Sequence, residues 1–222
     1  MPALLAFDSS AAHCAAVLVR DDAIAETRFQ AMERGQAEAL MPILTDLLRG
    51  AGLGWNGIDA FGVGIGPGNF TGTRIAVAAA RGLALATGRP ALGISMFDIL
   101  RHAEEEVPDP VLTCLPAPRG QVYAELRPGD GSTQTFTFDG DEPILPRDLP
   151  DGTVILGHRA EDLALRLGGT GRPRHIADLP RSLGREAMRR FGGGPPFSRP
   201  APLYARAADA APPREMPPPI VP

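Results

Sequence analysis

The stretch GPGNFTGTR at residues 66–74 runs directly into IAVAAARGLALATG at residues 75–88. It follows the apolar run FGVGI at residues 61–65, and this order predicts a strand, a tight turn and a long helix. The unpaired N–H groups and the positive dipole at such a helix N-terminus favour anions. The predicted helix has almost no polar face, however, which indicates that something besides its own sheet covers it.

The glycine-rich turn does not match either common nucleotide-binding motif. A P-loop has two glycines separated by four residues and then Lys-Ser/Thr, whereas five residues separate Gly66 from Gly72 and Thr73-Arg74 follows. Lysine is absent from the chain, because all 22 basic residues are arginine. This excludes lysines that bind phosphate, form Schiff bases or act as general bases. A dinucleotide GxGxxG motif also fails, because no glycine follows Gly66 and Gly68 at the required spacing.

Composition indicates an ordinary globular protein. The 222 residues suffice for one large or two small domains, and a net charge of −4 argues against bulk electrostatic attraction to nucleic acid. Cys14 and Cys114 lie in strand-like apolar runs, which is typical of buried thiols in a reducing compartment. The apolar start is stopped by Asp8 and no run is long enough to span a bilayer, so we expect a cytoplasmic protein with no membrane partner.

Hydrophobic periodicity predicts an order of elements that repeats. The first half contains predicted strands at 3–7, 14–19, 24–29, 60–65 and 91–94, with helices at 36–49, at 71–86 and after Ser95. The second half contains predicted strands at 111–115, 120–127, 132–138, 153–157 and near 174–177, with helices at 158–167 and 182–191.

Three strands followed by alternating helix and strand, twice over, is the order of the actin-like, ribonuclease-H-like fold. This is an α/β fold with two similar subdomains, each a mixed sheet flanked by helices. We expect the subdomains at 1–104 and 105–206. Prolines occupy ten of the last 28 positions, so residues 207–222 are predicted to be a proline-rich tail.

An actin-like ATPase needs a phosphate-binding hairpin in each half, with an aspartate and a flexible turn. The candidate nucleotide-binding residues here are Asp8, Ser9, Gly66, Gly68 and Thr71. The first hairpin has no glycine, and the second, LPAPRG at residues 115–120, contains two prolines that remove two N–H donors. A site that hydrolyses nucleotide is therefore disfavoured, although a structural nucleotide at a subunit interface stays open.

Other catalytic chemistry finds no support in the sequence. The four histidines are scattered, and none forms a metal-ligand pair at helical spacing with another ligand; they are His13, His102, His158 and His175. A serine hydrolase would have to use Asp8, Ser9 or Ser10 and His13 within one hairpin, and no GxSxG motif exists. We predict no catalytic residue and no metal site.

Two predicted helices carry unusually wide apolar faces. On the helix from Thr71, one stripe is apolar except for two arginines one heptad apart, whereas the opposite stripe of small residues suits burial on the sheet. The helix from Gln36 has a similarly wide apolar face. The predicted partner interface consists of Leu40, Ile43, Leu44, Leu47, Arg74, Val77, Ala78, Arg81 and Leu85. The alternative is that a loop or the proline-rich tail covers both helices.

The string GPGNFTGTRIAVAAARGLA resembles the hallmark segment of the bacterial TsaB (YeaZ) family. The resemblance extends to LLAFDSSAAHCAAVLV near the start, EALMPILTDLL, RGQVY at residues 119–123 and PLYAR at residues 202–206, and so covers roughly residues 1–206. It implies an actin-like fold and a non-catalytic accessory subunit of the system that forms threonylcarbamoyladenosine next to the tRNA anticodon.

The same resemblance implies the partners. The helix pair would bind a TsaD-type catalytic subunit, a TsaE-type ATPase would join the complex, and the free protein would form a homodimer through the same surface. Contact with tRNA would be indirect, through the complex. The alternative function is a stand-alone actin-like ATPase or phosphotransferase.

Overall fold

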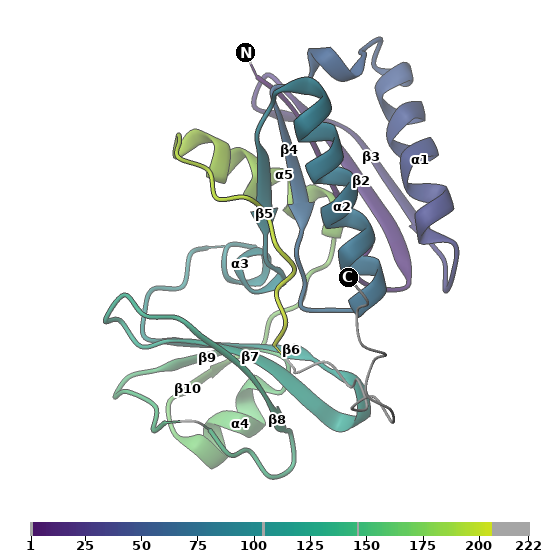
Figure 1. Cartoon of the computed structure of the whole chain (residues 1–222). Helices are drawn as coiled ribbons and strands as arrows, with labels where there is room; N and C mark the ends of the chain where they lie inside the picture. The colour runs from purple at the N-terminus through teal and green to yellow at the C-terminus, as the bar shows by residue number, and fades with distance from the viewer. Residues whose placement is uncertain (1, 104, 146, 206–222) are drawn as a thin grey trace, which may run out of the picture.

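The computed structural model describes residues 2–103, 105–145 and 147–205, which form two lobes stacked one above the other (Figure 1). The first lobe contains β1 (Ala3–Asp8), β2 (His13–Arg20), β3 (Ala23–Ala31), α1 (Gln36–Gly50), β4 (Ala60–Gly64), α2 (Phe70–Thr87), β5 (Ala91–Ile94) and α3 (Met96–Arg101). The second contains β6 (Val111–Pro116), β7 (Gln121–Arg127), β8 (Gln134–Asp139), β9 (Val154–Gly157), α4 (Ala160–Leu167) and β10 (Thr170–Arg172). Helix α5 (Leu179–Gly192) follows, and short 3-10 turns lie at Trp55–Gly57 and Pro118–Gly120.

The two sheets have the same topology. The first has the strand order β3-β2-β1-β4-β5, and the second, read in the same sense, has the order β8-β7-β6-β9-β10. In each sheet the first three strands pair antiparallel, and the last two add parallel to the first strand's free edge. The predicted actin-like α/β fold with two mixed sheets is therefore confirmed.

The first sheet is covered on both faces, which explains why β1 is buried along its whole length. Leu5 and Phe7 point to the core under α1 and α2, whereas Leu4 and Ala6 point to the core under α5. Successive side chains of a strand point to opposite faces of the sheet. A strand between two helical layers therefore has a continuous apolar sequence.

Helix α5 belongs to the first lobe, although it follows the second sheet in sequence. It packs against all five strands of the first sheet, and Leu183 and Ala187 complete the core on that face (Figure 1). The predicted subdomain boundaries at 1–104 and 105–206 are therefore wrong for this helix. The physical reason is that the first sheet has two apolar faces, and α1 and α2 can cover only one.

The strand predicted near residues 174–177 is also wrong. The last strand, β10, lies at Thr170–Arg172 and pairs in parallel with β9. Pro173 follows and has no N–H to donate, so the pairing stops there. Arg174 then donates to the carbonyl oxygens of Leu100 and Arg101, and the chain turns back to the first lobe.

A network of buried charges joins the lobes. Asp98 on α3 accepts hydrogen bonds from Arg127 of β7, at 2.8 Å, and from Arg190 of α5. Glu186 on α5 accepts two hydrogen bonds from Arg189, at 2.7 and 2.8 Å. Because Asp98 is buried, its pairs with Arg127 and Arg190 fix α3, β7 and α5 relative to one another, whereas the pair of Glu186 with Arg189 lies within α5.

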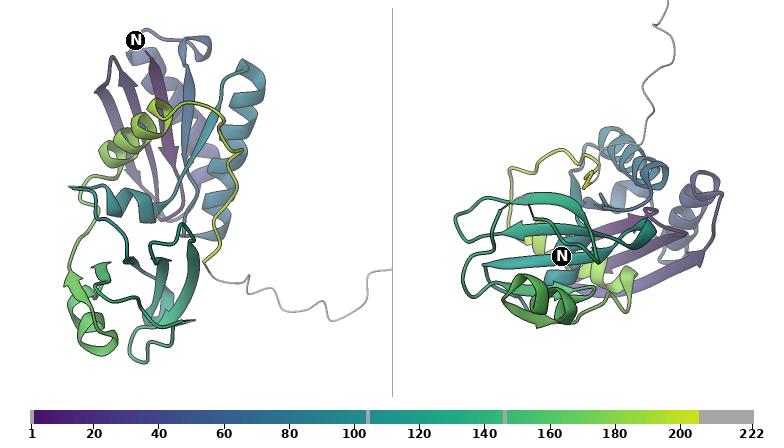
Figure 2. Two further views of the ribbon diagram at one scale, coloured as in Figure 1. Left: turned by 90° about the vertical axis from the view of Figure 1, so that its left-hand side faces the viewer. Right: turned by 90° about the horizontal axis from the view of Figure 1, so that it is seen from below.

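The segment after α5, residues 197–205, forms a strap along the first lobe. It runs from α5 to the lower end of α2 (Figure 2). The N–H of Leu203 donates to the carbonyl oxygen of Ile65 at 2.8 Å, and the hydroxyl of Thr137 in β8 donates to the carbonyl oxygen of Ala205 at 2.8 Å. The strap therefore contacts both lobes. The predicted proline-rich tail at 207–222 lies outside the described residues.

Candidate protein interface and degenerate phosphate site

The turn between β4 and α2 packs directly on the hairpin between β1 and β2. A methyl group added at Gly72 would lie 1.9 Å from the carbonyl oxygen of Ser9, and one added at Gly68 would lie 2.3 Å from the carbonyl oxygen of Ser10. The hydroxyl of Ser9 donates to the carbonyl oxygen of Gly72 at 2.8 Å. Both glycines are therefore needed because two backbone segments meet without room for a Cβ atom.

The carboxylate of Asp8 is fully buried. Its Oδ1 atom accepts hydrogen bonds from the N–H and the hydroxyl of Ser10, each at 3.0 Å, and lies 2.8 Å from Nε2 of His13. Among the described residues its Oδ2 atom has no hydrogen-bond partner, and a Cβ atom added at Gly64 would lie 1.9 Å from it. The carboxylate therefore holds the hairpin together and is closed off from solvent.

The N-terminus of α2 is capped from within the chain. The side-chain oxygen of Asn69 accepts from the N–H of Gly72 at 3.0 Å, and its carbonyl oxygen accepts from the N–H of Thr73 at 2.9 Å. The carbonyl oxygen of Gly66 accepts from the N–H of Met96 at 2.9 Å, whereas Thr71 is exposed. The five candidate nucleotide-binding residues thus lie together at one end of the first sheet. The carboxylate of Asp8, the hydroxyl of Ser9 and the carbonyl oxygen of Gly66 already form hydrogen bonds within the chain.

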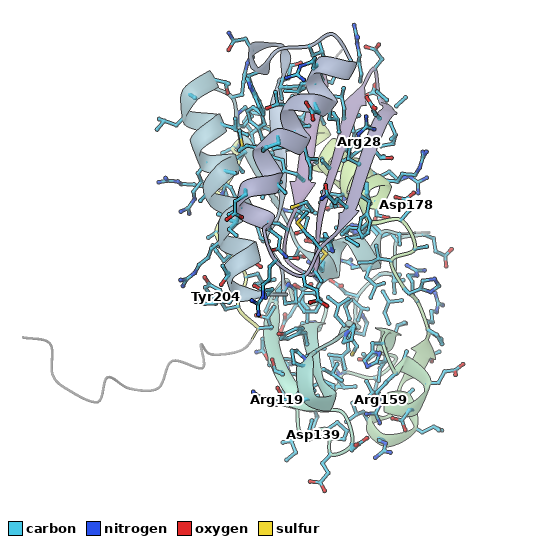
Figure 3. The ribbon with its side chains drawn as sticks, turned by 90° about the vertical axis from the view of Figure 1, so that its right-hand side faces the viewer. Arg28, Arg119, Asp139, Arg159, Asp178 and Tyr204 are labelled. Carbon is cyan, nitrogen blue, oxygen red and sulfur yellow. The ribbon has the colours of Figure 1, made fainter. Side chains whose placement is uncertain are left out.

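The hairpin of the second lobe is more open. Arg119 adopts a left-handed conformation with φ of 62°, and its side chain lies exposed at the end of the hairpin (Figure 3). Pro116 and Pro118 are also exposed and offer no N–H group. The hairpin can therefore present one guanidinium but not the row of backbone donors that cradles a phosphate.

The cavity beside the first hairpin also lacks the groups that bind a polyphosphate. It is an open groove of about 540 Å³, and its wall includes His13, Phe29, Met96 and Leu179. Among the described residues its lining contains no arginine, and Asp178 adds a negative charge. A ligand with several negative charges would find no matching cations there.

The predicted interface residues fall into two groups. Leu40, Leu44, Leu47 and Val77 are buried in the core between the sheet and its two helices, so they are not available to a partner. This corrects their assignment as contact residues. The physical reason is that α1 must use its whole apolar stripe to cover the sheet, which leaves little of that stripe for a second surface.

The other predicted interface residues are at the surface. Arg74, Ala78 and Leu85 are exposed on α2, and Ile43 and Arg81 are partly exposed. The exposed side of α2 also includes Thr71, Gly82 and Ala86, so it is a flat surface of small residues that ends in a leucine exposed to 87%. We call this surface, residues 71, 74, 78, 82, 85 and 86, the α2 face.

An aromatic cluster lies at the lower end of the α2 face. The guanidinium carbon of Arg74 lies 3.6 Å from the centre of the Phe70 ring, and its Nε donates to the hydroxyl of Tyr204 at 2.8 Å. The rings of Phe70 and Tyr204 lie 5.2 Å apart, and both side chains are more than 40% exposed. Tyr204 of the strap, labelled in Figure 3, therefore holds the exposed Arg74 against Phe70.

Sequence reasoning missed Phe70 and Tyr204 as surface residues, and it missed the strap. Arg81, predicted to pair with a partner, donates to the carbonyl oxygen of Pro200 at 2.8 Å. The sequence left open that another segment of the chain covers the two helices. Residues 197–205 do so in part, because they lie along one side of α2. The available signal was PLYAR at residues 202–206, an apolar and aromatic string within a proline-rich region.

The described residues contain no group of three His, Cys, Asp or Glu side chains placed to hold a metal ion. Both cysteines are buried, and burial raises the pKa of the Cys114 thiol to about 12, so this thiol is a poor nucleophile. Within the part of the chain that the structure describes, no helix has the length and apolar character required to cross a bilayer.

The chain is similar to known proteins in sequence and in fold. The family model described as TsaD, tRNA N6-adenosine threonylcarbamoyltransferase, matches residues 30–134. The chain is 30% identical over 122 residues to the tRNA threonylcarbamoyladenosine biosynthesis protein TsaB of Escherichia coli (strain K12), which covers 54% of this chain and 52% of that protein. It is 32% identical over 124 residues to the TsaB protein of Haemophilus influenzae, which covers 54% and 51%. The chain thus spans about half the length of the curated relatives it matches.

Solved structures extend the similarity over nearly the whole chain. A protein from Pseudomonas aeruginosa with similarity to the peptidase YEAZ superposes with a TM-score of 0.67 and 26% identity, covering 93% of this chain and all of that chain. YeaZ from Pseudomonas aeruginosa superposes with a TM-score of 0.62 and 28% identity, covering 87% and 94%.

The repeated strand order, with two mixed five-stranded sheets of the same topology, defines a protein with an actin-like fold. Within that class the chain is similar to TsaB (YeaZ) proteins, at 30–32% identity over 54% of its length. It also superposes on YeaZ from Pseudomonas aeruginosa over 87% of its length.

Proposed function

We propose that this protein is a non-catalytic subunit of the system that forms threonylcarbamoyladenosine in tRNA, and that it binds a TsaD-type threonylcarbamoyltransferase. The observation that carries the proposal is the α2 face, a long exposed surface of small and apolar residues on a chain similar to TsaB proteins. A contiguous exposed surface of small and apolar residues is a common feature of protein contact sites.

The chemistry of the α2 face suits a helix-to-helix contact. Ala78 and Gly82 have almost no side chain, so a partner helix could approach the backbone closely. Phe70, Arg74 and Tyr204 at one end and Leu85 at the other would be the anchors, because aromatic, arginine and large apolar side chains dominate binding energy. A stable complex would bury about 1,200–2,000 Å² in total.

The other expected partners follow from the same proposal. A TsaE-type ATPase would join the complex, tRNA would contact it only indirectly, and the free protein would form a homodimer through the α2 face. A structural nucleotide between subunits stays an open prediction, since the groups around Asp8 are closed within one chain.

The test is a charge placed on the α2 face. Leu85→Glu and Ala78→Glu are expected to weaken binding to the TsaD-type protein of the same organism at least tenfold, because each would bury an unpaired carboxylate. Leu165→Glu is the matched control: Leu165 is 89% exposed and, like Leu85, lies two residues before the end of its helix, α4. Light scattering on a sizing column, with circular dichroism to verify folding, measures the effect. Normal assembly by folded Leu85→Glu and Ala78→Glu variants would refute the interface.

The competing function, a stand-alone ATPase, makes the opposite prediction for nucleotide. We expect that ATP with magnesium leaves the midpoint of thermal unfolding unchanged, because the first hairpin is closed and the second has lost two N–H donors. A saturable rise in the midpoint, abolished by Asp8→Asn, would favour the ATPase function instead.

A further inference from the structure

A small cavity lies between α3 and α5. Helix α5 covers the face of the first sheet opposite α2 (Figure 1). The volume of the cavity is about 90 Å³. Ile99, His102 and Ala103, three and four residues apart, form the wall on the side of α3. The opposite wall comes from α5, where residues 182, 185, 186 and 189 share one side of the helix.

The wall contributed by α5 contains two arginines. Arg185 and Arg189 both line the cavity, and among the described residues Glu186 is the acidic side chain in its lining. The carboxylate of Glu186 is already fully used: Arg189 donates two hydrogen bonds to it, Arg190 donates one at 3.0 Å, and Nδ1 of His102 lies 3.0 Å away. It therefore balances the charge of Arg189 beside the cavity. On the side of α3, Oε1 of the exposed Glu106 lies 3.8 Å from Nε2 of His102. Arg185 is then the lining arginine that has no carboxylate partner among the described residues.

Two polar side chains in the lining are not committed to the protein. Within the described residues, the guanidinium of Arg185 makes no hydrogen bond or ion pair, and the hydroxyl of Ser182 makes no hydrogen bond. The other exposed arginines of this helix differ from Arg185, since Arg181 pairs with Asp178 at 3.2 Å and Arg189 with Glu186. Arg185 and Ser182 are three residues apart, so both can reach the same ligand.

The size of the cavity limits what it can hold. Pockets for whole cofactors or drug-sized molecules usually measure about 300–1,000 Å³, far more than this one. A space of this volume instead suits one compact group with a few waters. Arginine forks and hydroxyl donors match the oxygens of a tetrahedral anion.

We propose that this cavity binds a single phosphate group, with the Arg185 guanidinium and the Ser182 hydroxyl as its main donors and Arg189 as a fixed neighbouring cation. The phosphate comes either from free phosphate or from a nucleic acid backbone, since one phosphate group presents the same oxygens in both cases. The second source would replace the indirect tRNA contact expected above by a direct one. The site is independent of the α2 face, so it stands or falls separately from the proposed partner binding.

The experiment is a titration of the full chain with inorganic phosphate at constant ionic strength, followed by the imidazole NMR signals of His102. We expect a saturable shift in the wild type. Arg185→Gln should raise the dissociation constant about tenfold or more, because hydrogen bonds to charged groups are the strong ones. Ser182→Ala should raise it about threefold to tenfold. Both side chains are at the surface or nearly so, and circular dichroism would verify that the fold is retained.

Arg181→Gln is the matched control, because Arg181 lies on the same helix but does not line the cavity. It should leave the dissociation constant unchanged. A second titration uses an RNA stem-loop. If the RNA competes with phosphate for the wild type and this competition is lost in Arg185→Gln, the source is the nucleic acid backbone. If the RNA does not compete with phosphate, the source is free phosphate. A wild type without a saturable shift, or an equal loss in Arg181→Gln, would overturn the proposed site.

Discussion

Replacing Gly72 by alanine is expected to lower the free energy of unfolding by about 2–4 kcal/mol. The added methyl group would lie 1.9 Å from the carbonyl oxygen of Ser9, which belongs to the backbone of the hairpin. A side chain could rotate away, but a backbone carbonyl cannot. The hairpin and the N-terminus of α2 would have to separate, which would also break the hydrogen bond from Ser9 to Gly72. Urea unfolding followed by circular dichroism measures the change.

Gly82→Ala is the control for this prediction. Gly82 lies in the same helix, and a methyl group added there would have no atom within 4 Å. Alanine should therefore stabilise the helix by about 0.5–1 kcal/mol, since only its better helix propensity counts. Equal stability of Gly72→Ala and Gly82→Ala would contradict the close packing of the turn on the hairpin.

Acid is expected to destabilise the protein most steeply through Glu186. Burial opposes ionisation of this carboxyl, but hydrogen bonds from Arg189 and His102 outweigh it and hold its pKa at about 2. The pKa in the unfolded chain is near 4.5, so the pKa is lowered on folding. The stabilisation is complete above that value and is lost as the pH falls from about 4.5 towards 2. It amounts to roughly 2–3 kcal/mol after allowance for solvent screening.

The measurement is the free energy of unfolding between pH 7 and pH 2, compared with that of Glu186→Gln. The variant should be less stable at pH 7 and should lose less stability between pH 4.5 and 2. Glu106→Gln is the matched control, because Glu106 also lies near His102 but its side chain is 66% exposed. Parallel curves for the wild type and Glu186→Gln would show that the ion pairs on α5 do not set the acid sensitivity.

The order of the elements could be predicted from sequence because each strand and helix carries a local signal. The helix after Ser95 is one example: the hydroxyl of Ser95 accepts from the N–H of Asp98 at 3.0 Å, as the capping pattern predicts. The helix predicted at 182–191 begins earlier, at Leu179, because Asp178 caps it and Pro180 fits its first turn.

Contacts between distant segments were not predictable, because no local pattern encodes them. The apolar stripe with Leu40, Leu44 and Leu47 looks the same whether it covers the chain's own sheet or a partner, so only the structure separates the two. Likewise, the position of α5 on the first sheet depends on that sheet's second apolar face. The sequence-derived α2 residues Arg74, Ala78 and Leu85 are exposed because the stripe of small residues opposite them is taken up by the sheet.

The position of α5 has a consequence for the order in which the chain is made. The ribosome first synthesises the strands β1 to β5 and the helices α1 to α3 of the first lobe, and then the whole second sheet. Only after these does it synthesise α5, the helix that covers the remaining face of the first sheet. Until then Leu4, Ala6, Val17 and Val19 stay uncovered, since their layer of the core needs Leu183 and Ala187. The core of the first lobe therefore stays incomplete until the second lobe has been synthesised. A nascent chain that ends after β5 carries an exposed apolar sheet, which favours aggregation.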